Sequence, residues 1–129
     1  MPCYTAPMSV QKKMLKEMSF QRSDCPIACA LDVIGDKWTL LIIRDLLRGK
    51  QRFSEFMDSQ EGLKTNILTD RLKRLQNAGL LERSAYQDNP PRYQYALTDE
   101  GKDLWPMLKE MILWANKNIP GTTMPLKKN

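Results

Sequence analysis

Apolar residues recur along most of the chain at the three- and four-residue spacing of helices. A first run begins after Cys25 and Pro26, ends at Gly35, and contains Ile27, Ala30, Leu31 and Ile34. The next segment, residues 36–48, is apolar on nearly its whole circumference and is expected to start at a cap on Asp36. A helix that is apolar on almost every side is typical of the centre of a domain, so we expect this one to be buried.

Two further helices are predicted on either side of a glycine-containing turn. The first is short, spans about residues 53–57 and is expected to have Ser54 as its cap. The second is longer, begins at a cap on Thr65 and ends at Gly79, with an inward stripe of Leu68, Leu72 and Leu75. A short helix, a tight turn and a longer helix together form a helix-turn-helix pattern.

The hydrophobic period then changes from that of a helix to that of a strand. Residues 80–86 and 92–98 alternate like two strands, and the turn former QDNPP separates them. Proline lacks the N–H that a central strand requires, so the pattern favours an exposed hairpin. A hairpin directly after a helix-turn-helix is the wing of a winged helix. The predicted fold is therefore mainly helical with one small β-hairpin.

Both ends of the chain are predicted to carry a helix with an unpartnered apolar stripe. A helical extension over 9–24 follows a flexible start at 1–8, and a last helix over 102–120 precedes a flexible tail at 121–129. Thr98 is expected to cap the last helical segment and Pro106 to kink it. Because wide exposed apolar stripes are usually interfaces, we predict that the two helices form a dimer interface. Its expected residues are Met14, Met18, Leu104, Leu108, Met111, Ile112 and Ala115.

Composition narrows the function classes. The chain has 129 residues, of which 42% are hydrophobic, enough for one domain with a real core. It contains no histidine, which excludes Ser-His-Asp and Cys-His catalytic groups and histidine metal ligands. Three cysteines cannot form a four-cysteine zinc site, and no stretch is typical of a signal peptide or a membrane span. We therefore expect a cytoplasmic protein that is not an enzyme and has no cofactor, metal site or membrane partner.

The distribution of charge points to an acidic partner. Lys and Arg number 20 against 15 Asp and Glu, a net charge of +5, and residues 64–74 hold four cations and one carboxylate. With the leucine stripe inward, Asn66, Asp70 and Lys73 point outward. Asp70 is expected either to accept from a cytosine amine or to brace Arg74. The predicted DNA-contacting residues are Lys64, Thr65, Asn66, Thr69, Asp70, Arg71, Lys73 and Arg74, with Arg83 and Arg92 near the wing tip.

Several motifs together resemble those of one family. They are Cys25-Pro26, the block from Gly35 to Leu40, Leu68 to Leu75, Pro90 to Tyr95, and Leu97 to Gly101. Over residues 25–118 the chain resembles the HxlR family of bacterial winged-helix transcription regulators. The resemblance implies a DNA-binding domain over 25–101 and a homodimer joined through its amino- and carboxy-terminal helices. It also implies two recognition helices in successive major grooves of a pseudo-palindromic operator on double-stranded DNA.

Cys25 is a candidate sensor of oxidants or electrophiles, because some members of that family use the cysteine at this position. Its sulfur would lie at a helix amino terminus, where backbone N–H groups favour the reactive thiolate. The alternative is a small residue that only begins the helix. A small-molecule effector of unidentified chemistry is a further candidate partner.

Plainer interpretations stand beside these predictions. Trp38 and Trp114 are expected to be core residues rather than a stacking pair for a ligand, and Asp45 a surface charge rather than a catalytic acid. The alternative function is a winged helix that binds only other proteins. Such a module would have a neutral recognition helix, whereas this one is cationic, and retention on heparin would discriminate the two.

Overall fold

The computed structural model describes residues 23–122, and the predictions for Met14 and Met18 lie outside the described residues. Within that part, helices and one hairpin follow each other in the predicted order. The elements are α2 (Pro26–Ile34), α3 (Thr39–Leu47), α4 (Phe53–Met57), α5 (Thr65–Asn77), β1 (Leu81–Asp88), β2 (Pro91–Leu97), α6 (Asp99–Lys102) and α7 (Trp105–Asn118). The prediction of a mainly helical fold with one β-hairpin is confirmed.

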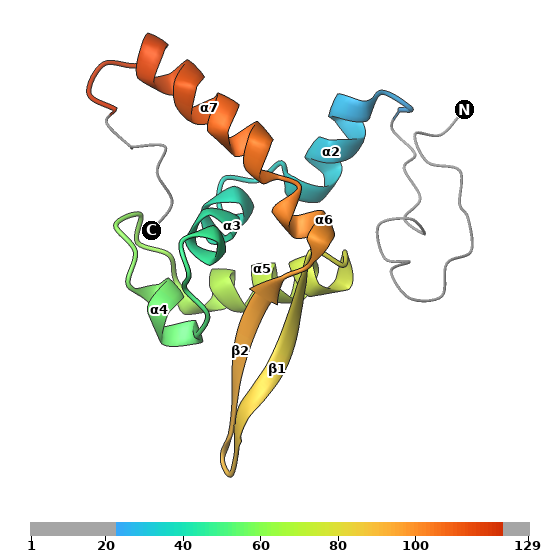
Figure 1. Cartoon of the computed structure of the whole chain (residues 1–129), viewed down its shortest axis with the longest axis vertical. Helices are drawn as coiled ribbons and strands as arrows, with labels where there is room; N and C mark the ends of the chain where they lie inside the picture. The colour runs from blue at the N-terminus through green and yellow to red at the C-terminus, as the bar shows by residue number, and fades with distance from the viewer. Residues whose placement is uncertain (1–22, 123–129) are drawn as a thin grey trace.

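The helices form a compact body from which the hairpin projects at one end (Figure 1). In this view α3 lies at the centre, α4 and α5 lie below it, and α2 and α7 extend from the end opposite the hairpin. The hairpin is a two-stranded antiparallel sheet. This arrangement presents α5 and the wing at one end of the molecule and the exposed faces of α2 and α7 at the other.

The core forms where the central helix α3 meets α5. Ile42 and Ile43 of α3 and Leu68 of α5 are fully buried. Leu72 and Leu75 are also buried, which confirms the predicted inward stripe of α5. Because α3 contacts neighbours on most of its circumference, its apolar residues leave little surface for solvent.

Of four helix starts, one agrees with the sequence and three differ. Cys25 is the N-cap of α2, with Pro26 as the first helical residue. Asp36, expected to cap the next helix, lies two residues before the N-cap Trp38, and its carboxylate accepts the Thr39 N–H at 2.9 Å. Ser54, predicted as a cap, lies inside α4, and the Glu55 carboxylate instead accepts two backbone N–H groups before that helix. Thr65 is the first residue of α5, so the prediction that it caps this helix was one residue late. A capping residue differs from a first-turn residue only in its backbone angles, which a sequence pattern does not fix.

The last helical segment is two helices rather than one kinked helix. The Thr98 hydroxyl accepts the Gly101 N–H at 3.2 Å and caps α6, as predicted. The chain then leaves helical pairing at Asp103 and Leu104, and Pro106 is the second residue of α7. Proline has no N–H to donate, so it is tolerated in the first turn of a new helix and not in the interior of a long one.

The wing is longer than predicted and is attached to the helix-turn-helix. Its strands pair from Leu81 opposite Leu97 at the base to Asp88 opposite Pro91 at the tip. The Tyr95 N–H donates to the Gln51 carbonyl at 2.8 Å, which fixes β2 to the segment before α4. The predicted turn QDNPP is therefore mostly strand, because its flanking residues complete the antiparallel ladder.

Asp45 is buried, so the prediction of a surface charge was wrong. Only 2% of the residue is exposed. Its carboxylate pairs with Arg44 at 3.0 Å and Lys50 at 3.7 Å. Arg44 also donates to both carboxylate oxygens of Glu61, at 3.0 and 3.1 Å, in the turn before α5. A buried charge is costly unless it is paired, and here the pairing connects α3 to the turn of the helix-turn-helix.

Candidate nucleic-acid interface

The outward face of α5 is polar and exposed. Its inward stripe faces the core, which directs the remaining positions to solvent. The exposed residues are Lys64, Thr65, Asn66, Thr69, Asp70, Lys73 and Arg74. Hydroxyl, amide and carboxylate groups lie here beside cations, so the face combines hydrogen-bonding groups for base edges with charges for phosphates.

The cations of this face differ in their pairing. Arg74 lies 3.7 Å from Asp70, one turn earlier, so the predicted brace between them is present. Lys64 and Lys73 make no ion pair with any residue of 23–122. These two ammonium groups are therefore the ones whose charge no neighbouring carboxylate offsets.

Arg71, predicted among the DNA contacts, is turned toward the domain. Its side chain is 17% exposed and donates to the carboxylates of Asp36 and Asp70. Desolvation raises the pKa of Asp36, but hydrogen bonds from Thr39 and then Arg71 outweigh it, and its pKa lies below the ordinary value. Arg71 is thus an ion-paired residue at the edge of the core rather than part of the open face.

The wing carries one predicted cation near its tip and one near its base. Arg92 is exposed and lies opposite Gln87, next to the tip, as predicted. Arg83 lies opposite Tyr95 near the base, so its predicted place at the tip was wrong, and its guanidinium carbon is 4.0 Å from the Tyr93 ring centroid. The error follows from the turn, which is shorter than QDNPP and leaves Arg83 five residues below the end of β1.

The sequence patterns did not predict Arg52, which lies directly before α4, as part of this surface. Its guanidinium carbon lies 3.9 Å from the Tyr86 ring centroid, in the cation–π arrangement that Arg83 also makes. A groove of about 370 Å³ between α4 and the wing is lined in part by Arg52, Tyr86, Arg92 and Tyr93. The signal available in the sequence was an arginine directly before a short helix, which is too common to indicate a site.

Cys25 is a free thiol on the surface. It is exposed, and its backbone N–H donates to the Ser23 hydroxyl at 2.9 Å. Cys29, one turn further along α2, is buried. Within residues 23–122, no group of three or more Cys, Asp or Glu side chains is arranged to hold a metal ion.

Apolar side chains remain exposed on α2 and α7. Ile27 is 71% exposed and Trp114 62%, so the prediction of Trp114 as a core residue was wrong, whereas Trp38 packs against the core. Leu108, predicted at the dimer interface, is buried in the core of the single chain, and Leu104 packs partly against that core. Further exposed apolar residues are Leu31, Met107, Met111, Leu113 and Ile119.

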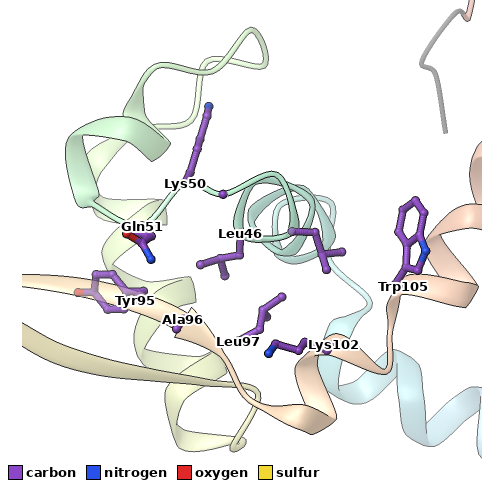
Figure 2. A pocket seen from close by; sticks show the side chains of 10 residues that line it. Leu46, Lys50, Gln51, Tyr95, Ala96, Leu97, Lys102 and Trp105 are labelled. Carbon is purple, nitrogen blue, oxygen red and sulfur yellow. The ribbon is translucent and has the colours of Figure 1, made fainter. Parts of the chain in front are cut away.

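A second groove, of about 340 Å³, lies at the base of the wing between α3, β2, α6 and α7 (Figure 2). Leu46, Leu97 and Trp105 provide apolar walls. In Figure 2 the Lys50 ammonium points away from the groove, and it is bound to Asp45 and the Asp58 carbonyl. The groove therefore touches both the wing and the start of α7.

Comparisons with known proteins all point in one direction. A family model described as HxlR-like helix-turn-helix matches residues 33–123. The uncharacterized helix-turn-helix-type transcriptional regulator YvaP of Bacillus subtilis is 39% identical over 100 residues, which cover 77% of this chain and 93% of that protein. A similar regulator of Synechocystis sp., sll1512, is 37% identical over 67% of this chain, and the match spans only 64% of its own length.

A solved structure gives the same fold. The redox regulator HypR in its oxidized form is 35% identical, with a TM-score of 0.66, and the match covers 73% of this chain and 97% of HypR.

Among the helices of residues 23–122, none combines the length and the apolar character needed to cross a bilayer.

Proposed function

The chain belongs to the HxlR-like helix-turn-helix family of transcriptional regulators, and on this premise we propose that it binds a pseudo-palindromic operator as a homodimer. The observation that carries the proposal is the outward face of α5. There, Asn66 and Thr69 lie exposed beside the unpaired ammonium groups of Lys64 and Lys73. In each protomer α5 would enter a major groove, and Arg92 would reach the neighbouring backbone or minor groove.

The division of labour on this surface follows from the chemistry of the side chains. Amides and hydroxyls hydrogen-bond base edges and so carry sequence preference, whereas ammonium and guanidinium groups neutralise phosphates of any sequence. Asn66, in the first turn of α5, would read a base. Lys73 and Arg92 would bind phosphates and determine how strongly binding depends on salt.

Titration of an operator fragment at several salt concentrations tests this division. The fragment is first selected from genomic DNA that co-purifies with the protein. We expect Lys73→Ala and Arg92→Ala each to weaken binding to all sequences and to reduce the salt slope by about one. Asn66→Ala should instead relax preference at one or two base pairs, at a cost of about 1–3 kcal/mol. Unchanged salt slopes in both cation variants, or no retention of the wild type on heparin, would favour the protein-binding alternative.

The dimer would be formed by the exposed apolar faces of α2 and α7. Large apolar side chains left exposed in number on neighbouring helices often mark an interaction site. Two-fold symmetry would hold the two recognition helices about 34 Å apart, one turn of B-DNA. Of the residues predicted for the interface, Met111 is 48% exposed, while Ile112 and Ala115 are half-buried.

We further propose that Cys25 makes the regulator responsive to electrophiles or oxidants. Its thiol is exposed at the amino terminus of α2, the helix that also carries the exposed Ile27 and Leu31. A quinone would add to the sulfur: a C–S bond forms, the thiol proton passes to the quinone, and a hydroquinone thioether results. An adduct there would lie beside the proposed dimer face and would alter the spacing of the recognition helices. HypR, by its name a redox regulator, supports the direction of this proposal.

Comparison of the wild type with Cys25→Ser tests the sensor. We expect treatment with benzoquinone to change operator affinity in the wild type and to leave the variant unchanged. Mass spectrometry of the treated protein should place the adduct on Cys25. Equal changes in affinity for the two proteins would show that Cys25 is not the sensor and only begins the helix.

A further inference from the structure

We propose that Arg71 is a positioning residue, which fixes the recognition helix against the start of α3 through Asp36 and does not itself bind a DNA phosphate. The inference rests on the proposed DNA binding and refines it. It also replaces the phosphate contact that the sequence predicts for Arg71.

The first support is the direction of the side chain. Arg71 donates through Nε to Asp36 and through Nη1 to Asp70. Its side chain is 17% exposed, compared with 58% for Arg74 on the same helix. Arg71 is therefore less accessible to a phosphate than Arg74 is.

The second support is the way Asp36 is shared between two elements. One of its oxygens accepts the Thr39 N–H at 2.9 Å, at the start of α3. The other accepts from Arg71, which lies 35 positions further along the chain in the middle of α5. One carboxylate therefore joins the first turn of the central helix to the recognition helix. Charge-assisted hydrogen bonds of this kind are directional, so they restrict the rotation of α5 about its own axis.

The third support is electrostatic. Two carboxylates already offset the charge of Arg71, and the Asp36 side chain is 28% exposed. A phosphate contact would have to break these bonds and would leave Asp36 partly buried without its counter-charge, which is unfavourable. Lys64 and Lys73 have no ion pair within residues 23–122 and would bind phosphates without such a loss.

Asp36 lies in a short connection with a closely packed backbone. Asp36 follows Gly35 in the short connection between α2 and α3, where a Cβ on Gly35 would lie 2.2 Å from the Leu31 carbonyl oxygen. The backbone therefore leaves no room for a side chain at this point. Arg71 thus binds to a carboxylate that the Thr39 N–H also holds.

The experiment measures operator affinity and its salt slope for Arg71→Ala, Asp36→Asn and the double variant. Asparagine retains an oxygen for the Thr39 N–H, so Asp36→Asn removes the charge and keeps that hydrogen bond. Lys73→Ala is the matched control, because it removes an unpaired cation two positions away.

We expect each single variant to bind the operator about tenfold more weakly, as the loss of a charge-assisted hydrogen bond would give. The double variant should bind no more weakly than either single one, because both changes break the same pair. The salt slope should stay at the wild-type value in all three, whereas Lys73→Ala should lower it by about 0.9. Thermal unfolding of each variant establishes that the protein used in the titrations is folded.

Two results would overturn the inference while leaving DNA binding intact. One is a salt slope for Arg71→Ala reduced as much as for Lys73→Ala, which would make Arg71 a phosphate contact. The other is unchanged or tighter binding by Asp36→Asn, which would mean that the pair withholds Arg71 from DNA. Failure of the wild type to bind any DNA would instead overturn the proposed function, and the positioning role with it.

Discussion

Gly101 shows how closely α6 approaches the base of the wing. A Cβ at this position would lie 2.2 Å from the Leu80 carbonyl oxygen and 2.7 Å from Leu97 Cδ2. A backbone oxygen cannot move aside as a flexible side chain can. The glycine of the Leu97–Gly101 motif is therefore required by packing, in a helix whose preceding cap, Thr98, also donates to the Gly79 carbonyl at 2.6 Å.

Replacement of Gly101 by alanine should therefore destabilise the domain. We expect Gly101→Ala to lower the free energy of unfolding by about 1–3 kcal/mol, as overpacking against a fixed neighbour does. Urea denaturation followed by circular dichroism measures the loss. Lys102→Ala, at the exposed next position of α6, serves as the control and should stay within about 0.5 kcal/mol of the wild type. Equal stability of Gly101→Ala and the wild type would contradict the close approach of α6.

The sequence predicts residues well where the signal is local. The spacing of Leu68, Leu72 and Leu75 was enough to orient α5, because a helix has one fixed period. The direction of the Arg71 side chain could not be predicted in this way, because its partner Asp36 lies far away in the sequence, in the connection between α2 and α3. The prediction that Asp45 is exposed was wrong for a similar reason. On a helix that is apolar on nearly every side, no pattern in the sequence distinguishes a buried, paired carboxylate from an exposed one.

The turn between α4 and α5 is held by a carboxylate whose pKa is shifted. A hydrogen bond from Arg44 lowers the pKa of Glu61 below its ordinary value of 4.5. Two backbone N–H groups, of Gln51 and Arg52, similarly lower the pKa of Glu55 at the start of α4. In both cases the folded state favours the charged carboxylate.

These pKa shifts predict how the free energy of unfolding falls at acidic pH. A carboxyl group with a depressed folded-state pKa stabilises the fold above its unfolded value, and the contribution disappears as the pH falls through the lower folded value. For Glu61 the loss should begin near pH 4.5 and continue below it. We expect Glu61→Gln to be less stable than the wild type at neutral pH and to lose less stability on acidification. Denaturant titrations over this pH range measure both, and parallel acid limbs in the two proteins would contradict the role of the Arg44–Glu61 pair.

Elements were harder to delimit than to identify. Every helix and strand over 23–122 except the four-residue α6 corresponds to a periodic segment of the sequence, and the single last helix is two helices, α6 and α7. Residues 98–103 carry no apolar side chain and the apolar stripe starts at Leu104, so periodicity describes α7 alone and gives no sign of a break within the segment that Thr98 caps. Pro106 did give that sign, and the structure places the interruption just before it.

At the level of the whole molecule, the hairpin and the two helices α2 and α7, which carry exposed apolar residues, lie at opposite ends (Figure 1). Trp114 is the most exposed aromatic residue among those described, and it shares one face of α7 with Met107 and Met111. An unpartnered tryptophan of this size is typical of the central residue of an interface.

The proposed homodimer therefore should depend on Trp114. We expect Trp114→Glu to weaken association by about 2 kcal/mol or more and to shift the protein toward monomer at micromolar concentration. Sedimentation equilibrium measures the state of assembly. Lys109→Glu, which introduces the same side chain on the opposite side of α7, should leave the dimer intact. A monomeric wild type, or equal dissociation in the two variants, would exclude this face as the interface.

The ion pair between Arg71 and Asp36 bears on any attempt to retarget this regulator by transplanting a recognition helix. A donor helix that lacks an arginine at the position of Arg71 would leave the Asp36 carboxylate without its partner. The transplanted helix would then lose the ion pair that we propose sets its rotation about its own axis. The exchangeable unit is therefore the set of exposed positions, such as Asn66, Thr69 and Lys73, and not the helix as a whole. A designer who keeps Arg71 and varies only that set would inherit the orientation of α5 from the host.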